Sequence, residues 1–178
     1  MANAYQPELW RDLFVMVGTA AASLVGLLFV VMSLHINAIR ERPDENMSAT
    51  IHAARNNTYH LLTALVTAAR VLVPQPPPAL GAELVAVHLF GFRLPVIFTY
   101  RYFIEQRGGF PFSMIVTIST GYLLGAAGGA ALIGEASWGV YLVAASCVII
   151  LVRSVLTAWM LMFGRRPDDS PATTHQPT

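Results

Sequence analysis

Six ionisable residues stand inside segments of this chain that are otherwise largely apolar. They are Arg70, Glu83, Arg93, Arg153, His60 and His88. Within a bilayer a charge costs about 2.5–3.5 kcal/mol on insertion scales, so a charged residue there normally binds a ligand, lines a pathway or pairs with another group. These six residues are therefore the candidates for a binding site or a transport pathway.

One of these segments carries its polar residues on a single helical face. At 100° per residue, five polar side chains between positions 56 and 70 fall within an arc of about 80°. They are Asn56, His60, Thr63, Thr67 and Arg70. A helix surrounded by lipid would not carry such a stripe, so the sequence predicts that this face is turned toward protein or water.

The arginine at the end of this stripe has one obvious counter-charge. If the segments on either side of the proline-rich residues 74–78 form an antiparallel hairpin, Arg70 and Glu83 lie at a similar depth. An ion pair between them is predicted, either as a structural clasp or as part of a gate or substrate site. On the second segment, His88 points away from the face that Glu83 and Arg93 share.

Arg93 and Arg153 have no such counter-charge in the sequence. Arg93 lies between Gly91 and Pro95, where a kink is expected. Broken helices can mark transport sites, although the arginine can also extend toward the interface. Arg153 lies about ten residues, or about 15 Å, from the inner end of its segment, on one face with Ser146 and Thr157. Helix carbonyls, water, lipid phosphate, an anion or a partner subunit could meet its charge, so a structural role and a ligand or pathway role both stay open.

The chain carries no pattern typical of an enzyme. It has no nucleophile motif, no glycine-rich phosphate loop and no pair of carboxylates. Its single cysteine, Cys147, excludes an intramolecular disulfide and a cysteine-based zinc site. His52, Asn56 and His60 follow a helical spacing that could hold a metal or haem, but without acidic or cysteine companions they are expected to be helix-end residues at the interface. No catalytic residue, metal or cofactor is therefore predicted.

The composition places the chain in a membrane. Of its 178 residues, 55% are hydrophobic and 12% are charged, about half the charged share of a typical soluble domain. All 11 basic residues are arginines, and the net charge is +1. These values exclude a soluble enzyme with a solvated surface, a disordered chain and a nucleic-acid binder with a basic face. The sequence predicts a small all-α integral membrane protein.

Five helical spans are predicted from apolar segments of the length that a bilayer requires, about 20 residues. They cover residues 13–34, 57–73, 79–98, 112–133 and 138–163. Residues 1–163 would form one transmembrane helical bundle, and the polar residues 164–178 a disordered cytoplasmic tail. The hairpin at 57–98 could also be re-entrant, because that arrangement would leave the same charges on the same side.

The arginines indicate the orientation of the chain through the positive-inside rule. With five spans, one side of the membrane collects seven arginines and the other collects Arg11. The seven are Arg40, Arg42, Arg55, Arg101, Arg107, Arg165 and Arg166. The predicted topology therefore places the N-terminus outside and the C-terminus in the cytoplasm.

Two spans carry small residues at four-residue spacing, which lets helix backbones approach closely in lipid. One triplet is Gly18, Ala22 and Gly26, and the other is Gly121, Gly125 and Gly129. Each triplet covers an arc of about 80° and forms a narrow groove for another helix. The partner helix can belong to the same subunit or to a second copy in a homo-oligomer.

The first span has a recognisable order of residues. It reads WRDLFVMVG at 10–18, AAA at 20–22, GLLFV at 26–30 and SL at 33–34. In these positions it resembles the opening of a group of uncharacterised bacterial multi-span integral membrane proteins. The resemblance implies a multi-pass protein of the bacterial inner (plasma) membrane and assigns no catalytic residue. The exclusive use of arginine, with abundant alanine, is also typical of a bacterium with a GC-rich genome.

Two functions follow from these features. The first is a structural or accessory membrane subunit that packs, and can self-associate, through its glycine faces. The alternative is a small channel or transporter lined by the polar stripes of the second, third and fifth spans, with an anionic solute favoured by the net positive charge inside the membrane. In both cases the expected partners are the lipid bilayer and a homo-oligomer or larger membrane complex, and not nucleic acid.

Overall fold

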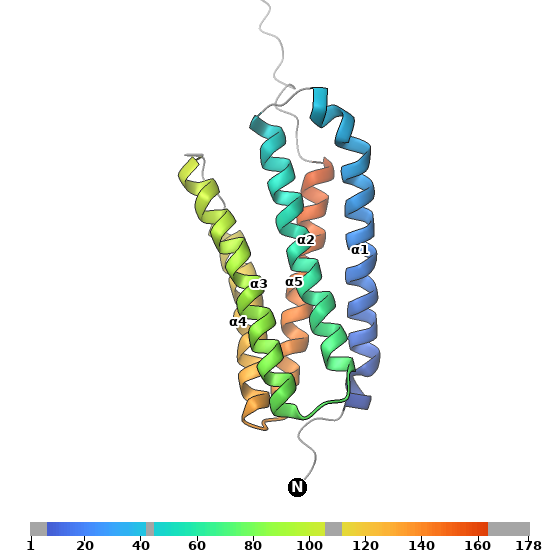
Figure 1. The fold of residues 1–178 in the computed structure, drawn as a ribbon, viewed down its shortest axis with the longest axis vertical. Helices are drawn as coiled ribbons and strands as arrows, with labels where there is room; N and C mark the ends of the chain where they lie inside the picture. Colours follow the sequence, from blue (N-terminus) through green and yellow to red (C-terminus); the bar gives the residue numbers. More distant parts are fainter. Residues whose placement is uncertain (1–6, 42–44, 106–111, 164–178) are drawn as a thin grey trace, which may run out of the picture.

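The computed structural model describes residues 7–41, 45–105 and 112–163 of the 178-residue chain. These residues form five helices and contain no strand, which confirms the predicted all-α class (Figure 1). The helices are α1 (Pro7–Glu41), α2 (Glu45–Leu72), α3 (Pro77–Glu105), α4 (Phe112–Ile133) and α5 (Gly139–Phe163). The predicted tail, 164–178, lies outside the described residues.

Successive helices run in opposite directions along the long axis of the bundle (Figure 1). The start of α1 lies at the same end as the α2–α3 and α4–α5 connections, and this end is called the hairpin end below (Figure 1). Toward the opposite end, the pair α3–α4 leans away from α1, α2 and α5 (Figure 1). Helix α1 packs on α2 and α5, whereas α4 lies between α3 and α5.

The first three helices are longer than the apolar segments from which they were predicted. Helix α2, for example, begins at Glu45 rather than at residue 57, and α3 continues to Glu105 rather than ending at residue 98. The apolar segments end where charged residues begin, but residues such as glutamate, alanine and arginine are good helix formers and continue the backbone hydrogen bonding. Apolarity therefore located the first three helices without locating their ends, whereas the predicted ends of α4 and α5 agree with the structure to within one residue.

Both connections at the hairpin end have clear local causes. Pro77 occupies the first position of α3, where the missing N–H costs no hydrogen bond. Helix α4 ends in a Schellman motif, in which Ala136 N–H donates to Ala131 O at 2.9 Å and Glu135 N–H donates to Leu132 O at 3.0 Å. Glu135 takes the left-handed conformation of this motif, with φ of 57°.

Helix α4 carries two adjacent glycines that bring it into direct backbone contact with a helix on either side. A Cβ added to Gly81 of α3 would lie 2.5 Å from the carbonyl oxygen of Gly129, and one added to Gly139 of α5 would lie 2.5 Å from that of Gly128. Real Cβ atoms do not approach other atoms so closely. These two glycine contacts, Gly81–Gly129 and Gly128–Gly139, hold α3, α4 and α5 together at the hairpin end.

The interior of the bundle is mostly apolar, but the surface also carries many large apolar side chains, and several polar side chains are buried. Large apolar side chains such as Phe29, Phe90 and Trp159 are more than half exposed. The buried polar and charged residues are Asn57, His60, Thr63, Thr67, His88, Ser146, Arg153, Ser154 and Thr157. By length and composition, three helices can cross a membrane, over Glu8–Ser33, Val116–Ile133 and Gly139–Trp159.

Candidate functional site

Tyr122 lies at the centre of the polar interior and joins three helices. Its side chain is 1% exposed, and its hydroxyl lies 2.8 Å from His60 Nδ1 of α2 and 3.5 Å from Thr63 Oγ1. On its other side, the rings of His88 and Phe92 of α3 lie 6.3 Å and 6.0 Å from the Tyr122 ring, measured between centroids. This tyrosine was not among the predicted candidates, although it is the one polar aromatic residue within the glycine-rich apolar run of α4.

His88, whose ring lies next to that of Tyr122, connects α3 to α5. Its ring is fully buried, and Nδ1 donates to the Leu84 carbonyl oxygen at 2.8 Å, since a carbonyl can only accept. Its Nε2 lies 3.2 Å from Ser146 Oγ, and that hydroxyl also lies 2.7 Å from the Gly121 carbonyl oxygen. The ring lies directly against Gly125, where any larger residue would overlap it. The role of this histidine is thus to bridge helices.

His60 and Arg153 line a hollow between α2, α4 and α5. Its other lining residues are Ile118, Ile149 and Ile150, and it encloses about 180 Å³ of empty space including its open side. His60 is 4% exposed and Arg153 is 9% exposed. The atoms His60 Nε2 and Arg153 Nε are both buried and have no hydrogen-bond partner among the described residues. Two of the six predicted candidates therefore come together here, from positions 93 residues apart.

Asn57 and Ser154 form a second polar contact between α2 and α5. Asn57 Nδ2 donates to the Ser154 carbonyl oxygen at 3.2 Å. Asn57 Oδ1 and Ser154 Oγ are buried without partners among the described residues. Asn57 lies about one helical turn from His60, and Ser154 directly follows Arg153, so this part of α2 faces α5 with polar groups along about one turn.

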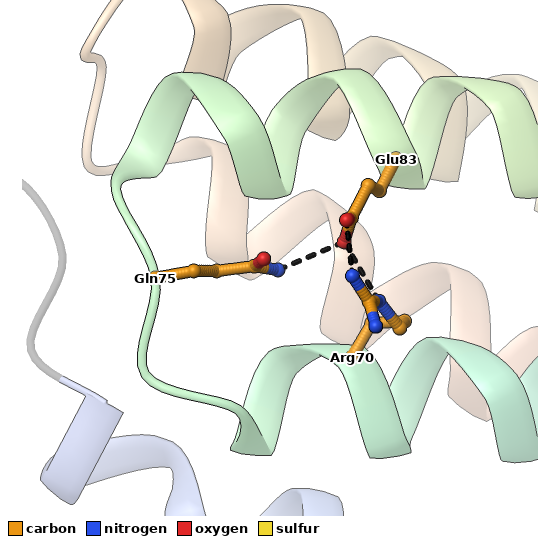
Figure 2. Close-up of polar contacts among 3 residues, drawn as sticks. All are labelled: Arg70, Gln75 and Glu83. Carbon is orange, nitrogen blue, oxygen red and sulfur yellow. Dashed lines mark hydrogen bonds and ion pairs between the residues drawn. The ribbon is translucent and has the colours of Figure 1, made fainter.

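Arg70 and Glu83 form the predicted ion pair at the hairpin end (Figure 2). Arg70 Nε donates to Glu83 Oε2 at 2.7 Å, and Arg70 Nη2 pairs with Oε1. Gln75, from the connection between the helices, donates to Glu83 Oε2 at 2.9 Å and was not predicted (Figure 2). Both charged side chains are partly exposed, at 39% and 37%. This geometry is that of a clasp that closes the α2–α3 hairpin.

The six predicted candidates do not form one site. Arg70 and Glu83 pair at the hairpin end, His60 and Arg153 line the hollow, and His88 bridges α3 to α5. Arg93 is exposed on the outer side of α3, five residues and therefore more than one turn beyond buried His88.

The two triplets of small residues also differ in their surroundings. Within α4, Gly121 faces Ile149 and Ile150 of α5, while Gly125 and Gly129 face α3. In the α1 triplet, Gly18 contacts another helix, since a Cβ added to it would lie 3.5 Å from the Cβ of Ala68 in α2. Ala22 and Gly26 are exposed, and a Cβ on Gly26 would meet nothing within 4 Å. The α4 triplet therefore packs within the subunit, and two members of the α1 triplet do not.

Among the described residues, no group of three histidine, cysteine or acidic side chains lies close enough to hold a metal ion. The side chain of His52 lies outside the described part of the chain. Comparisons with protein-family models, curated proteins and solved structures found no match to this chain.

Proposed function

We propose that this chain is a five-span integral membrane protein of a bacterial inner (plasma) membrane, and that its role is structural or accessory. The observation that carries the proposal is the exposure of many large apolar side chains, together with the burial of several polar ones. Such a surface is unfavourable in water, where monomeric proteins rarely expose large contiguous apolar patches. In a bilayer it is the favourable arrangement, because the exposed apolar side chains would face lipid and the buried polar residues would be kept away from it.

Helices α2 and α3 are also proposed to span the membrane. They contain 28 and 29 residues, or about 42 Å of helix, which exceeds the bilayer core of about 30 Å. Several of their polar residues, such as His60, Thr67 and His88, are buried against other helices, whereas Arg93 is exposed. The buried ones place no polar group against lipid.

A structural role is supported by how the polar interior is filled. Tyr122 and His88 occupy the centre of the bundle and bond across helices. Side chains held in this way connect helices to one another and leave the middle of the bundle packed. Self-association through α1 is consistent with the exposure of Ala22 and Gly26, where a second helix could approach the backbone closely.

The proposed topology predicts a labelling pattern for single cysteines in a Cys147→Ala background. Pro74→Cys and Ser137→Cys, in the two connections at the hairpin end, should react with an impermeant maleimide only in right-side-out membrane vesicles. Arg107→Cys and Thr174→Cys should react only in inside-out vesicles, because the arginine-rich side faces the cytoplasm. If residue 74 reacted only from the cytoplasmic side, or from neither side, the α2–α3 hairpin would be re-entrant and the five-span proposal wrong.

A second candidate function is a small channel or transporter for an anionic solute, lined by polar residues of α2, α3 and α5. It is favoured by Arg153, whose buried charge forms no ion pair with any described carboxylate. For the structural role, we expect purified protein in liposomes to show no chloride or phosphate flux above that of empty liposomes. Flux that Arg153→Ala or Arg93→Ala abolishes, while the variant keeps its helical circular dichroism, would instead establish transport.

A further inference from the structure

We propose that the hollow lined by His60 and Arg153 binds an oxyanion, meaning a phosphate or carboxylate group. This inference goes beyond the structural role, because a bundle can be held together without a ligand. It also requires no transport. The residues that would contact the ligand's oxygen atoms come from α2 and α5, and Ile118 of α4 covers the same hollow.

Arg153 supplies the first donor. Its Nε–H is buried without a partner among the described residues, on a side chain that is 9% exposed. A buried N–H without an acceptor costs about 1–3 kcal/mol, and more when the group is charged. An oxygen atom seated in the hollow would satisfy this group with a charge-assisted hydrogen bond.

His60 supplies the second donor, as its hydrogen-bond partner on the other side of the ring indicates. Thr63 Oγ1 donates to the Tyr59 carbonyl oxygen at 2.9 Å, and Tyr122 O–H therefore has two acceptors within reach. His60 Nδ1 at 2.8 Å is far better placed than Thr63 Oγ1 at 3.5 Å. When Tyr122 donates to Nδ1, the ring hydrogen of neutral His60 resides on Nε2. The unpaired Nε2 is then an N–H donor beside the guanidinium.

The charge in the hollow distinguishes an anion from a water molecule. A water molecule could accept the two hydrogen bonds, but it would leave the positive charge of Arg153 unbalanced in a buried place. No described carboxylate pairs with this guanidinium. The walls formed by Ile118, Ile149 and Ile150 are apolar, which strengthens the attraction between the guanidinium and an anion.

The hollow is small and open on one side. Its empty space of about 180 Å³ also counts the open surroundings, so its enclosed part has room for about one ligand oxygen atom. A phosphate or a carboxylate would therefore place one oxygen atom between the two donors and leave the rest of the group at the open side. The same group could come from a soluble anion or from the headgroup of an anionic lipid that reaches in from the bilayer, and the experiment separates these sources.

The test uses the purified full-length protein and its thermal unfolding. In a neutral maltoside detergent, phosphate is added against sodium chloride of equal ionic strength; in parallel, the protein is placed in nanodiscs of phosphatidylcholine with or without phosphatidylglycerol. If the site takes a soluble anion, near-saturating phosphate should raise Tm by about 4 °C or more. If it takes a lipid headgroup, phosphatidylglycerol should produce that shift and phosphate should not. The proposal is overturned if neither ligand shifts Tm.

Variants locate the site. Arg153→Gln should weaken the binding of the effective ligand by about ten-fold or more, because it removes one charge-assisted hydrogen bond. Arg11→Gln, an exposed arginine at the hairpin end of α1, should leave the ligand-induced shift unchanged. A shift that persists undiminished in Arg153→Gln would place the ligand elsewhere and contradict the proposal.

A second variant keeps both donors and tests the site even if Arg153→Gln fails to fold. Ile118→Phe adds bulk to the wall of the hollow and leaves His60 and Arg153 in place. It should reduce the ligand-induced shift by filling the space that the anion needs, and an undiminished shift would again contradict the proposal. The topology labelling described above does not depend on this ligand, so failure of the oxyanion site and failure of the five-span proposal give different results.

Discussion

Gly81→Ala is expected to lower the stability of the purified protein by about 3 kcal/mol, or its Tm by about 6–12 °C. The added Cβ would lie 2.5 Å from the Gly129 carbonyl oxygen and 2.8 Å from the backbone nitrogen of Ile133. Both atoms belong to the backbone of α4, so no side-chain rotation can relieve the overlap. Helices α3 and α4 must move apart, and α4 is also held by its contact with α5 at Gly139.

The control for this prediction is the same substitution at an open position. Gly26 lies on the exposed side of α1, and a Cβ there would meet nothing within 4 Å. Gly26→Ala should leave Tm unchanged or raise it, since alanine is up to about 1 kcal/mol more favourable than glycine in a helix. Thermal unfolding in detergent, followed by circular dichroism, measures both variants. Equal Tm values for the two variants would contradict the close backbone contact between α3 and α4.

Gly125→Ala is expected to destabilise the bundle by about 2–3 kcal/mol, or about 5–10 °C in Tm, through a side chain rather than the backbone. The new methyl group would overlap the imidazole of His88. That ring is held by Leu84 O on one side and Ser146 Oγ on the other, and moving it breaks both hydrogen bonds within a buried site.

The His88 ring itself provides the matched test of this mechanism. His88→Ala removes the group with which the Gly125 methyl would collide, so the double variant Gly125→Ala/His88→Ala should lose less stability than the sum of the two single variants. We expect this coupling to exceed about 1 kcal/mol, because the two residues are in direct contact. Strict additivity would show that the methyl group at position 125 acts on something other than His88.

The sequence predicted the positions of the helices because apolar segments and prolines are local features. The proline-rich connection between α2 and α3 separated two helices, and their antiparallel arrangement then implied that Arg70 and Glu83 meet. It also predicted that α4 packs closely through Gly125 and Gly129. Each of these conclusions depends on residues that are near one another in the sequence.

The glycine contacts show where local patterns stop being informative. Gly129 belongs to a triplet with regular spacing, but its partner Gly81 lies in the first turns of α3 and belongs to no such pattern. Likewise Gly139, the partner of Gly128, is the first residue of α5. At the start of a helix a glycine is ordinarily explained by the turn that precedes it. Its contact with another backbone depends on how two helices cross, and one sequence contains no direct signal of that.

The interior site was only half predictable for the same reason. Arg153 and His60 stood out as ionisable residues in apolar surroundings, and the sequence offered no sign that they share a hollow. Tyr122, which orients His60, was missed because a tyrosine in an apolar segment is usual and its partner is 62 residues away. Arg93 and His88 both belong to α3, but Arg93 is exposed and His88 is buried.

The clasp between Arg70 and Glu83 has a consequence for biosynthesis. The two residues are 13 positions apart, so little chain must be ordered to bring them together. They belong to α2 and α3, which are consecutive in the chain. A nascent chain can therefore pair these helices, with their charges already matched, before α4 and α5 leave the ribosome. Under the proposed five-span topology, these two helices would enter the bilayer as a hairpin in which this pair of charges is already matched.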